Sequence, residues 1–224
     1  MSKQNFTPTR RDLLKAGAMA VAASTLGLPE TSMAGAAQKS DPLRGLKLGI
    51  TSYTTRKLSL DDTIKAVKRV GLSYISLKDF HLALKSTREE RQAVAAKIKA
   101  AGLSLVGCGV INLKDEAEMR NAFEYAKDAN IPTIVATLNP ANVPMLDKLV
   151  KEHGIRVAIH NHGPEDKLFP TPDSVADAIA KYDERIGLCI DIGHTVRTGT
   201  DPAQAIRKHA PAALRSAPER RDFD

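Results

Sequence analysis

Aromatic residues are scarce in this sequence: it contains no tryptophan, and only 4% of its 224 residues are aromatic. Few aromatic rings argue against a broad carbohydrate-stacking surface and against a platform for stacked bases. The net charge of +7 comes from cations scattered along the chain, which form no basic stripe. We therefore expect no nucleic-acid partner.

Cysteine and long hydrophobic runs are also nearly absent. Cys108 and Cys189 both lie inside apolar, strand-like runs, where a buried thiol is the ordinary state. A disulfide between them remains an alternative in an exported protein. The apolar stretch 16–28 is too short and too interrupted to span a membrane as a helix.

Residues 1–36 are predicted to be a twin-arginine signal peptide. Thr9-Arg-Arg-Asp-Leu-Leu-Lys15 carries the paired arginines, and Ala34-Gly-Ala36 offers the small residues that a signal peptidase needs. The twin-arginine export machinery would then be a partner, and the protein would be periplasmic or extracellular. The alternative is a cytosolic protein with a flexible, alanine-rich leader.

From Gly45 onward, strand signals alternate with helix signals. Six strand–helix units joined by short links predict a parallel α/β fold of one domain, wound right-handed. The pattern alone does not separate a barrel from an open, doubly wound sheet. The predicted strands are 46–50, 74–77, 103–111, 134–138, 155–159 and 186–190, and the predicted helices are 59–70, 87–101, 115–129, 143–153, 172–182 and 202–209.

Two of these strands end in groups that bind metals or move protons. Val157–Glu165 reads Val-Ala-Ile-His-Asn-His-Gly-Pro-Glu, and Ile186–His194 reads Ile-Gly-Leu-Cys-Ile-Asp-Ile-Gly-His. Active sites of barrels and parallel sheets lie at the C-terminal ends of the strands. Since the two segments are about one strand–helix unit apart, we expect them to be neighbours around one pocket.

Alternation along the strands predicts which side chains face that pocket. His160 and His162 share one face, while Ile159 and Asn161 share the other. With the Asp191 carboxylate, the two imidazoles would form a nitrogen and oxygen ligand set for a divalent metal: Mn, Zn, Co, Mg or Fe. The alternative is that these histidines are hydrogen-bonded structural groups.

Two further residues follow the last predicted strand. His194 lies past the strand end, beyond the glycine at 193, and is a candidate for orienting a substrate hydroxyl or carbonyl. Arg197 is a candidate for holding an anionic or polyhydroxy group, although a loop arginine is often only solvated.

Three other residues complete the candidate site. Glu165 is a candidate general base, because abstracting a proton next to a carbonyl needs a carboxylate near a metal. The alternative for Glu165 is a plain surface residue. Lys78 and His81 follow the second strand, at the same end of the fold, and are weaker candidates for substrate binding.

Taken together, these motifs resemble the xylose-isomerase-like TIM barrels, the sugar phosphate isomerase/epimerase superfamily that also contains endonuclease IV. The resemblance covers about Leu46 to Pro211, and its most specific part is Gly187-Leu-Cys-Ile-Asp-Ile-Gly-His194, followed by Arg197. It implies a TIM-barrel type of α/β fold in which units one to six are present and strands seven and eight are missing. The domain organisation would be an incomplete barrel over 37–211 and an aberrant tail over 212–224.

The resemblance also implies roles for individual residues. Asp191 falls on a metal carboxylate and His194 on a substrate-binding histidine of the family. His160 falls where many members carry a metal-binding glutamate, and this departure puts the metal and the reaction in doubt. The family's remaining ligands come from the two strands that this chain lacks.

The tail has a specific explanation. Codons that encode Ala212–Asp224, if read one base later, can encode Arg-Leu-Tyr-Asp-Leu-His-Leu-Lys-Asp-Val, which matches the seventh strand that the family implies. The hypothesis is a one-base insertion near the Pro211 codon, which resequencing that codon would test. The alternative is a naturally short barrel with a basic tail.

The function implied by the resemblance is a metal-dependent isomerase or epimerase of a sugar, keto-sugar or inositol-type substrate, inactive if truncated. A lyase or hydrolase of oxidised sugars and a non-catalytic sugar-binding protein remain alternatives. A DNA-repair endonuclease is disfavoured by the export signal and by the lack of a dense His/Glu cluster.

Overall fold

A parallel six-stranded sheet is the frame of the fold. The computed structural model describes residues 45–213; the predicted signal peptide, its cleavage site and most of the predicted tail lie outside them. The strands pair in parallel in chain order, which confirms the predicted α/β fold class. They are β1 (Gly49–Thr51), β2 (Tyr74–Leu77), β3 (Ser104–Asn112), β4 (Thr133–Thr137), β5 (Arg156–His160) and β6 (Ile186–Cys189).

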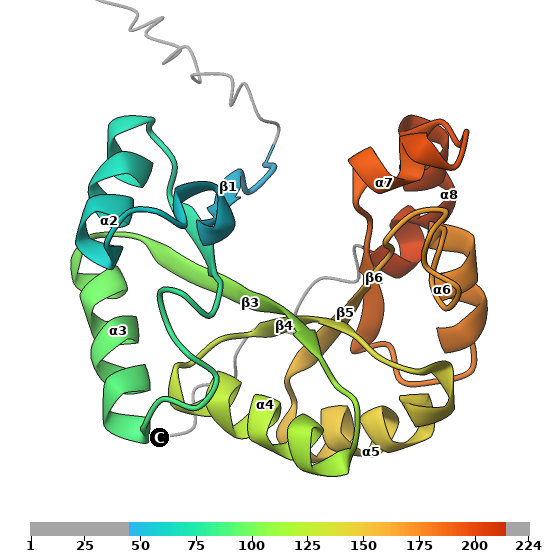
Figure 1. Ribbon diagram of the computed structural model, residues 1–224, viewed down its shortest axis with the longest axis horizontal. Coiled ribbons are helices and arrows are strands. Elements are labelled where there is room, and N and C mark those ends of the chain that lie inside the picture. Colours follow the sequence, from blue (N-terminus) through green and yellow to red (C-terminus); the bar gives the residue numbers. More distant parts are fainter. Residues whose placement is uncertain (1–44, 214–224) are drawn as a thin grey trace, which may run out of the picture. The chain divides into compact units, whose positions relative to one another are not determined.

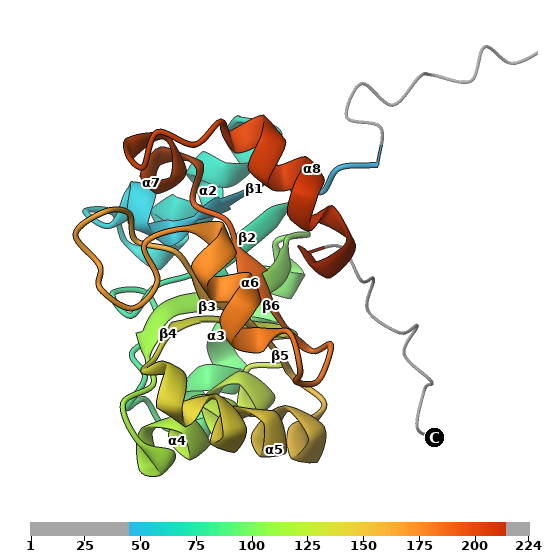
Figure 2. The same ribbon diagram turned by 90° about the vertical axis from the view of Figure 1, so that its right-hand side faces the viewer.

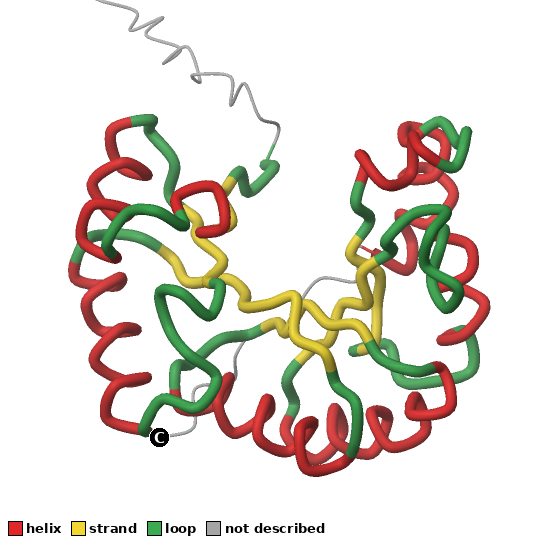
Figure 3. The backbone as a smooth tube through the Cα atoms, viewed as in Figure 1, coloured by secondary structure: helices red, strands yellow, loops and turns green. Residues whose placement is uncertain are grey.

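The helices that connect the strands lie on one face of the curved sheet (Figures 1 and 3). None of the described helices is long and apolar enough to cross a membrane. The α-helices are α2 (Leu60–Arg69), α3 (Arg88–Ala100), α4 (Glu116–Asp128), α5 (Val143–His153), α6 (Pro172–Ile179), α7 (Ile192–Arg197) and α8 (Pro202–Ala213), and the 3-10 helices are η1 (Ser52–Thr55) and η2 (Pro140–Asn142).

The predicted helix starts are confirmed in detail. The Ser59 hydroxyl accepts a hydrogen bond from the Asp62 amide at the N-terminus of α2. Thr87 and Glu90 form the predicted capping box of α3, in which each side chain accepts a bond from the other residue's amide. These bonds satisfy amides that the first helical turn leaves without partners, so the local sequence sets where each helix begins.

The core lies between the sheet and the helices. Along β5 the side chains alternate between buried and half-buried, with Val157 and Ile159 on the buried face. Apolar side chains of β4 and β6, such as Ile134 and Leu188, bury against the same helix layer. The half-buried alternate residues, His160 among them, therefore face the side of the sheet that none of the described helices covers.

Some elements differ from the prediction. The segment after β6 is not a loop, because Ile192–Arg197 forms the short helix α7. In the described range β6 is followed by α7 and α8 and by no further strand, so β1 and β6 are the two edges of the sheet. The predicted domain end at Pro211 falls within α8. Cys108 and Cys189 are both free thiols, so they do not form the alternative disulfide.

Helices α6 and α8 pack against each other and against β6 (Figure 2). His209 Nε2 lies 2.6 Å from Asp173 Oδ1, and Lys208 Nζ donates to Asp173 Oδ2 at 2.8 Å. These contacts join the start of α6 to α8, beside the strand that carries the second polar segment.

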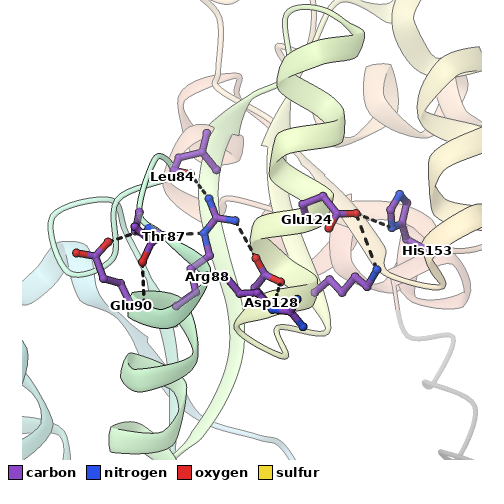
Figure 4. Close-up of polar contacts among 10 residues, drawn as sticks. Leu84, Thr87, Arg88, Glu90, Glu124, Asp128 and His153 are labelled. Carbon is purple, nitrogen blue, oxygen red and sulfur yellow. Dashed lines mark hydrogen bonds and ion pairs between the residues drawn. The ribbon is translucent and has the colours of Figure 1, made fainter.

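On the other flank, α3 and α4 are joined by a buried ion pair at Asp128, which is labelled in Figure 4 together with Leu84. Arg91 donates to Asp128 Oδ2 at 3.0 Å and to the Leu84 carbonyl oxygen at 2.9 Å. The Tyr125 hydroxyl of α4 donates to the Leu82 carbonyl oxygen at 3.0 Å. The loop between β2 and α3 is thereby bonded to α4 through Tyr125 and to α3 through Arg91.

Candidate functional site

The two polar segments meet at the C-terminal ends of β5 and β6, as expected. These strands are hydrogen-bonded neighbours, and His160 is paired in register with Cys189. Two residues beyond Cys189, the Asp191 carboxylate oxygen Oδ2 lies 3.5 Å from His160 Nε2. The Asp191 carboxylate and the His160 imidazole therefore lie together at the C-terminal end of two neighbouring strands.

Three imidazole rings gather around this pair. The ring centroids of His160 and His162 are 4.6 Å apart, and the ring of His194 lies 5.8 Å from the first and 5.9 Å from the second. His160 and His162 lie on the same face, as the alternation predicts. The cluster is partly shielded, because the side chain of His160 is 14% exposed and that of His162 32% exposed.

Asp191 is held in place by groups of α7 and of the segment that follows β5. It is the N-cap of α7, and its Oδ1 accepts a hydrogen bond from the His194 amide at 2.7 Å. Its own amide donates to Asn161 Oδ1 at 2.8 Å. The Asn161 amide group also donates to the Thr195 hydroxyl at 3.3 Å. These contacts fix one oxygen of Asp191 and leave Oδ2 directed at His160.

Asn161 was not among the residues that the sequence analysis singled out for the site. Its side chain is only 1% exposed and lies on the outer face of the segment, between the two inward histidines. The sequence did contain a signal for Asn161. It is a polar residue at a position where the strand pattern predicts a buried apolar one, and a buried polar side chain needs hydrogen-bond partners. The partners that it finds are the residues that set the position of Asp191.

His194 and Arg197 lie on α7 and not in a loop. Arg197 donates to His194 Nδ1 at 3.1 Å and forms an ion pair with Glu165. Gly163 has φ +88°, and a Cβ there would come within 3.3 Å of His194 Nδ1, so only glycine lets the two segments approach this closely. The side chain of Glu165 is 67% exposed and engaged by a guanidinium. The structure thus places Glu165 at the rim of the cluster.

Lys78 and His81 are in different surroundings. The Lys78 ammonium lies 6.0 Å from the Tyr53 ring centroid, and its charge acts on His160 across the site. The side chain of His81 is buried, with Nε2 at 3.2 Å from the Thr63 hydroxyl and 3.0 Å from the Leu58 carbonyl oxygen. The Lys78 ammonium therefore lies beside Tyr53, whereas His81 is packed against α2 and the segment before it.

The electrostatics of the cluster favour a neutral His160 ring beside an ionised Asp191 carboxylate. Burial lowers the pKa of His160, and the charges of His162, His194 and Lys78 add to this effect against the opposing charge of Asp191. Partial burial opposes the ionisation of Asp191, but the His194 amide and the neighbouring histidines outweigh it and hold its pKa below the ordinary value. Burial raises the pKa of the Cys189 thiol to about 11, so this residue stays protonated.

The donors in the cluster fit a divalent metal in their chemistry. His160 Nδ1 is buried and has no hydrogen-bond partner, and His162 Nδ1 lies 3.2 Å from Asp166 Oδ2 without hydrogen-bond geometry. Neutral imidazole nitrogen and carboxylate oxygen are ligands that Zn, Mn, Co and Fe accept. Among residues 45–213, however, no three His, Cys, Asp or Glu side chains are placed to hold one ion. The described part of the chain therefore offers a partial donor set.

Comparison with known proteins agrees with this architecture. The sequence profile described as "Xylose isomerase-like TIM barrel" matches residues 64–215. No curated protein sequence is significantly similar to the chain.

Solved structures share the fold. An uncharacterised protein from Parabacteroides distasonis is 22% identical with a TM-score of 0.65, and 75% of this chain covers 72% of that one. The 3-keto-D-glucoside 4-epimerase of E. coli is 13% identical with a TM-score of 0.63, and the coverage is 75% of this chain and 76% of that one. A protein from Rhodospirillum rubrum described as a xylose isomerase is 15% identical with a TM-score of 0.60, with 75% of each chain covered. At these identities the likeness shows the fold alone.

Proposed function

The chain belongs to the xylose isomerase-like TIM barrel family, and we propose from this premise that it is a metal-dependent sugar isomerase or epimerase. The reaction would move a proton at the carbon next to a carbonyl group. The observation that carries the proposal is the meeting of His160, His162 and Asp191 at the ends of adjacent strands, with a buried imidazole nitrogen that has no partner. The substrate would be a sugar or keto-sugar, the class that the family resemblance implies.

In this proposal His160 and Asp191 hold the metal, with His162 as a further donor. The metal, when bound, supplies Lewis-acid polarisation of the substrate carbonyl. Asp191 is preset for this role, because the His194 amide already fixes its Oδ1. The depressed pKa of His160 keeps its ring neutral, so that one of its two nitrogens carries the free lone pair that a metal ligand requires.

The remaining residues would hold the substrate and move the proton. His194 belongs to the imidazole cluster and lies on α7 with Arg197, and Lys78 follows β2 at the same end of the sheet. Their hydrogen-bond donors suit the hydroxyl and carbonyl oxygens of a sugar. Glu165 is the proposed base, and it would have to leave its ion pair with Arg197 to accept a proton.

Solvent deuterium exchange tests the proposal. The protein is supplied with Mn²⁺, Co²⁺, Zn²⁺, Mg²⁺ or Fe²⁺ and incubated in D₂O with a panel of keto- and aldo-sugars, and NMR follows deuterium entering next to the carbonyl. In the chain whose reading frame is restored after Pro211, as proposed below, we expect metal-dependent exchange that falls about 10²-fold or more in Asp191→Asn and His160→Gln. The matched control is Asp177→Asn, an exposed carboxylate of α6, which should keep full exchange. Exchange that survives a chelator would contradict the metal's role, and sugar binding without exchange would favour a binding protein.

Two proposals concern residues outside the described range. We propose that residues 1–36 direct twin-arginine export, which a reporter fused to this segment and to its Arg10→Lys, Arg11→Lys variant would test. We also propose that reading the codons after Pro211 one base later restores the missing strand. The exchange assay is therefore run on both forms, and the frame-restored chain is expected to bind metal more tightly, since it regains a predicted ligand.

A further inference from the structure

The carboxylate of Asp166 lies beside His162, one of the three imidazoles of the cluster. Asp166 Oδ2 is 3.2 Å from His162 Nδ1, and this nitrogen is buried. The side chain of Asp166 is 20% exposed, so the carboxylate is itself largely shielded from water. Both residues belong to the loop that follows β5. The sequence analysis assigned no role to Asp166, although a shielded carboxylate next to a candidate metal ligand is suited to one.

The other carboxylate oxygen of Asp166 is already engaged by the loop. Its Oδ1 accepts hydrogen bonds from the Leu168 amide at 2.7 Å and from the Phe169 amide at 3.2 Å. The Phe169 carbonyl oxygen accepts a bond from the His162 amide at 3.0 Å, and the Phe169 side chain is fully buried. The loop therefore directs Oδ1 to backbone amides and leaves Oδ2 as the atom that faces the ring of His162.

The two ring nitrogens of His162 differ in their surroundings. Nδ1 is buried against Asp166, whereas Nε2 makes no hydrogen bond to any described residue and is not buried. A neutral imidazole carries one proton, on one nitrogen or the other. Because an ionised carboxylate only accepts hydrogen bonds, Asp166 favours the tautomer with the proton on Nδ1. The lone pair is then on Nε2, the nitrogen that a ligand can reach.

We propose that Asp166 is a positioning residue of the metal site: its carboxylate accepts the Nδ1 proton of His162 and so leaves the lone pair of Nε2 for a divalent metal. Histidines that bind metals commonly donate their other nitrogen to a carboxylate, which fixes the tautomer and the orientation of the ring. The Nδ1–H group is not aligned with Oδ2 in this structure, and such bonds often tighten only when a site is occupied. The proposal rests on the metal site proposed above, but the tautomer is a property of the metal-free chain.

The substitution Asp166→Asn should reverse the tautomer and keep the loop. The Leu168 and Phe169 amides need an acceptor, so the oxygen of the new side chain takes the place of Oδ1 and its NH₂ group takes the place of Oδ2. An NH₂ group donates and does not accept, so it favours a lone pair on Nδ1 of His162. The imidazole proton then lies on Nε2, where it blocks the metal.

The test is NMR of the full metal-free chain with ¹⁵N-labelled histidine at about pH 8, where an imidazole is neutral. Two-bond proton–nitrogen correlations show which ring nitrogen carries the proton, and His162→Gln identifies the signals. We expect the proton on Nδ1 in the wild type and on Nε2 in Asp166→Asn. Addition of Zn²⁺ should then shift the His162 signals of the wild type, and Asp166→Asn should need about 10- to 100-fold more Zn²⁺ for the same shift.

The matched control is Asp201→Asn. Asp201 is also a loop carboxylate that accepts a backbone bond, from the Ala203 amide at 2.9 Å, but it forms no hydrogen bond or ion pair with any described histidine. This variant should keep the wild-type tautomer and the wild-type response to Zn²⁺. Thermal unfolding checks that both variants are folded, and the wild-type tautomer tests the proposal even if Asp166→Asn does not fold.

The outcomes separate this proposal from the proposed function. A wild-type proton on Nε2 of His162, or an unchanged tautomer in folded Asp166→Asn, would show that Asp166 does not set the ring. A wild-type response to Zn²⁺ that Asp166→Asn retains in full would remove the role of Asp166 and leave the metal site. The expected tautomers with no response of His162 to Zn²⁺ would instead remove the metal site, and with it both proposals.

Discussion

Two regions of the molecule bury polar side chains: the flank formed by α3 and α4, and the ends of β5 and β6. In the first region nearly all of these groups have hydrogen-bond partners, whereas in the second region buried imidazole nitrogens have none. Arg91 donates to Asp128, Leu84 and Ser86, and Tyr125 donates to Leu82. At the ends of β5 and β6, Nδ1 of His160 has no partner. Buried polar groups are normally satisfied, so the unpartnered Nδ1 atoms of His160, of His162 and, beside α2, of His81 are the ones that need an explanation.

Within the second region, the two faces of the segment at the end of β5 differ in the same way, because hydrogen-bonded side chains lie on one face and unpartnered ones on the other. The outer face of the segment holds Asn161, whose oxygen and nitrogen are both hydrogen-bonded. The inner face holds His160 and His162, which are close to each other and to Asp191. Asn161 positions the Asp191 residue, and the unpartnered nitrogens of His160 and His162 are available to bind a metal.

The largest expected effect comes from breaking the paired flank. Replacing Arg91→Met should lower the free energy of unfolding by about 3 kcal/mol, because Asp128 would keep a buried charge without its partner. Urea denaturation measures this change. The control is Arg88→Met, since Arg88 contacts the same carboxylate at 3.6 Å but is 69% exposed, and its loss should cost about 0.5 kcal/mol or less. Equal costs for the two variants would show that burial does not distinguish these pairs.

A smaller loss of stability is expected when the satisfied residue of the second region is removed. Asn161→Ala should cost about 2 kcal/mol, because the Asp191 amide and the Thr195 hydroxyl both lose a buried partner. Asn142→Ala, which removes one exposed bond to the Lys114 carbonyl oxygen, should cost about 0.5 kcal/mol. The imidazole NMR signals of His160 should shift in the first variant and not in the second. Unchanged signals would mean that Asn161 does not position the cluster.

The smallest effect is the pH dependence that His160 imposes on stability. Its pKa is lowered in the folded protein, first by burial, so the unfolded chain takes up this proton at a higher pH than the folded chain does. The contribution to stability is complete above about pH 6.5 and is lost as the pH falls through the folded pKa. The stability of the wild type relative to His160→Gln should therefore decline between about pH 7.5 and about pH 5.

Asp191→Asn sharpens this test, because it removes the charge that raises the pKa of His160. The decline attributed to His160 should become steeper in this background. A flat difference between wild type and His160→Gln, in either background, would show that burial does not bias the protonation of the ring.

The fold was predictable because its signals are local. The caps at Ser59 and Thr87 and the alternation along β5 depend on neighbours within a few residues. Helix α7 was missed because it is only 6 residues long, follows directly on a strand and contains a glycine. Its start is set by Asp191, a residue whose side chain suggested metal binding rather than capping.

The candidate site was predictable in part. The shared face of His160 and His162 follows from the twofold repeat of a strand, and the neighbourhood of Asp191 follows from the order of parallel units. The ion pair between Arg197 and Glu165 was not predictable, because it joins segments that are far apart in the sequence. The burial of His81 against α2 depends on a long-range contact in the same way.

The sequence by itself determined the parallel α/β architecture, the family resemblance and the residues at the strand ends, because periodicity and capping act over short stretches of chain. Only the tertiary structure decided which of those residues have hydrogen-bond partners. Asn161 is paired and His160 is not, and this depends on contacts between β5, β6 and α7. A cavity of about 400 Å³ under the β2–α3 loop, which Tyr125 of α4 helps to line, was decided in the same way.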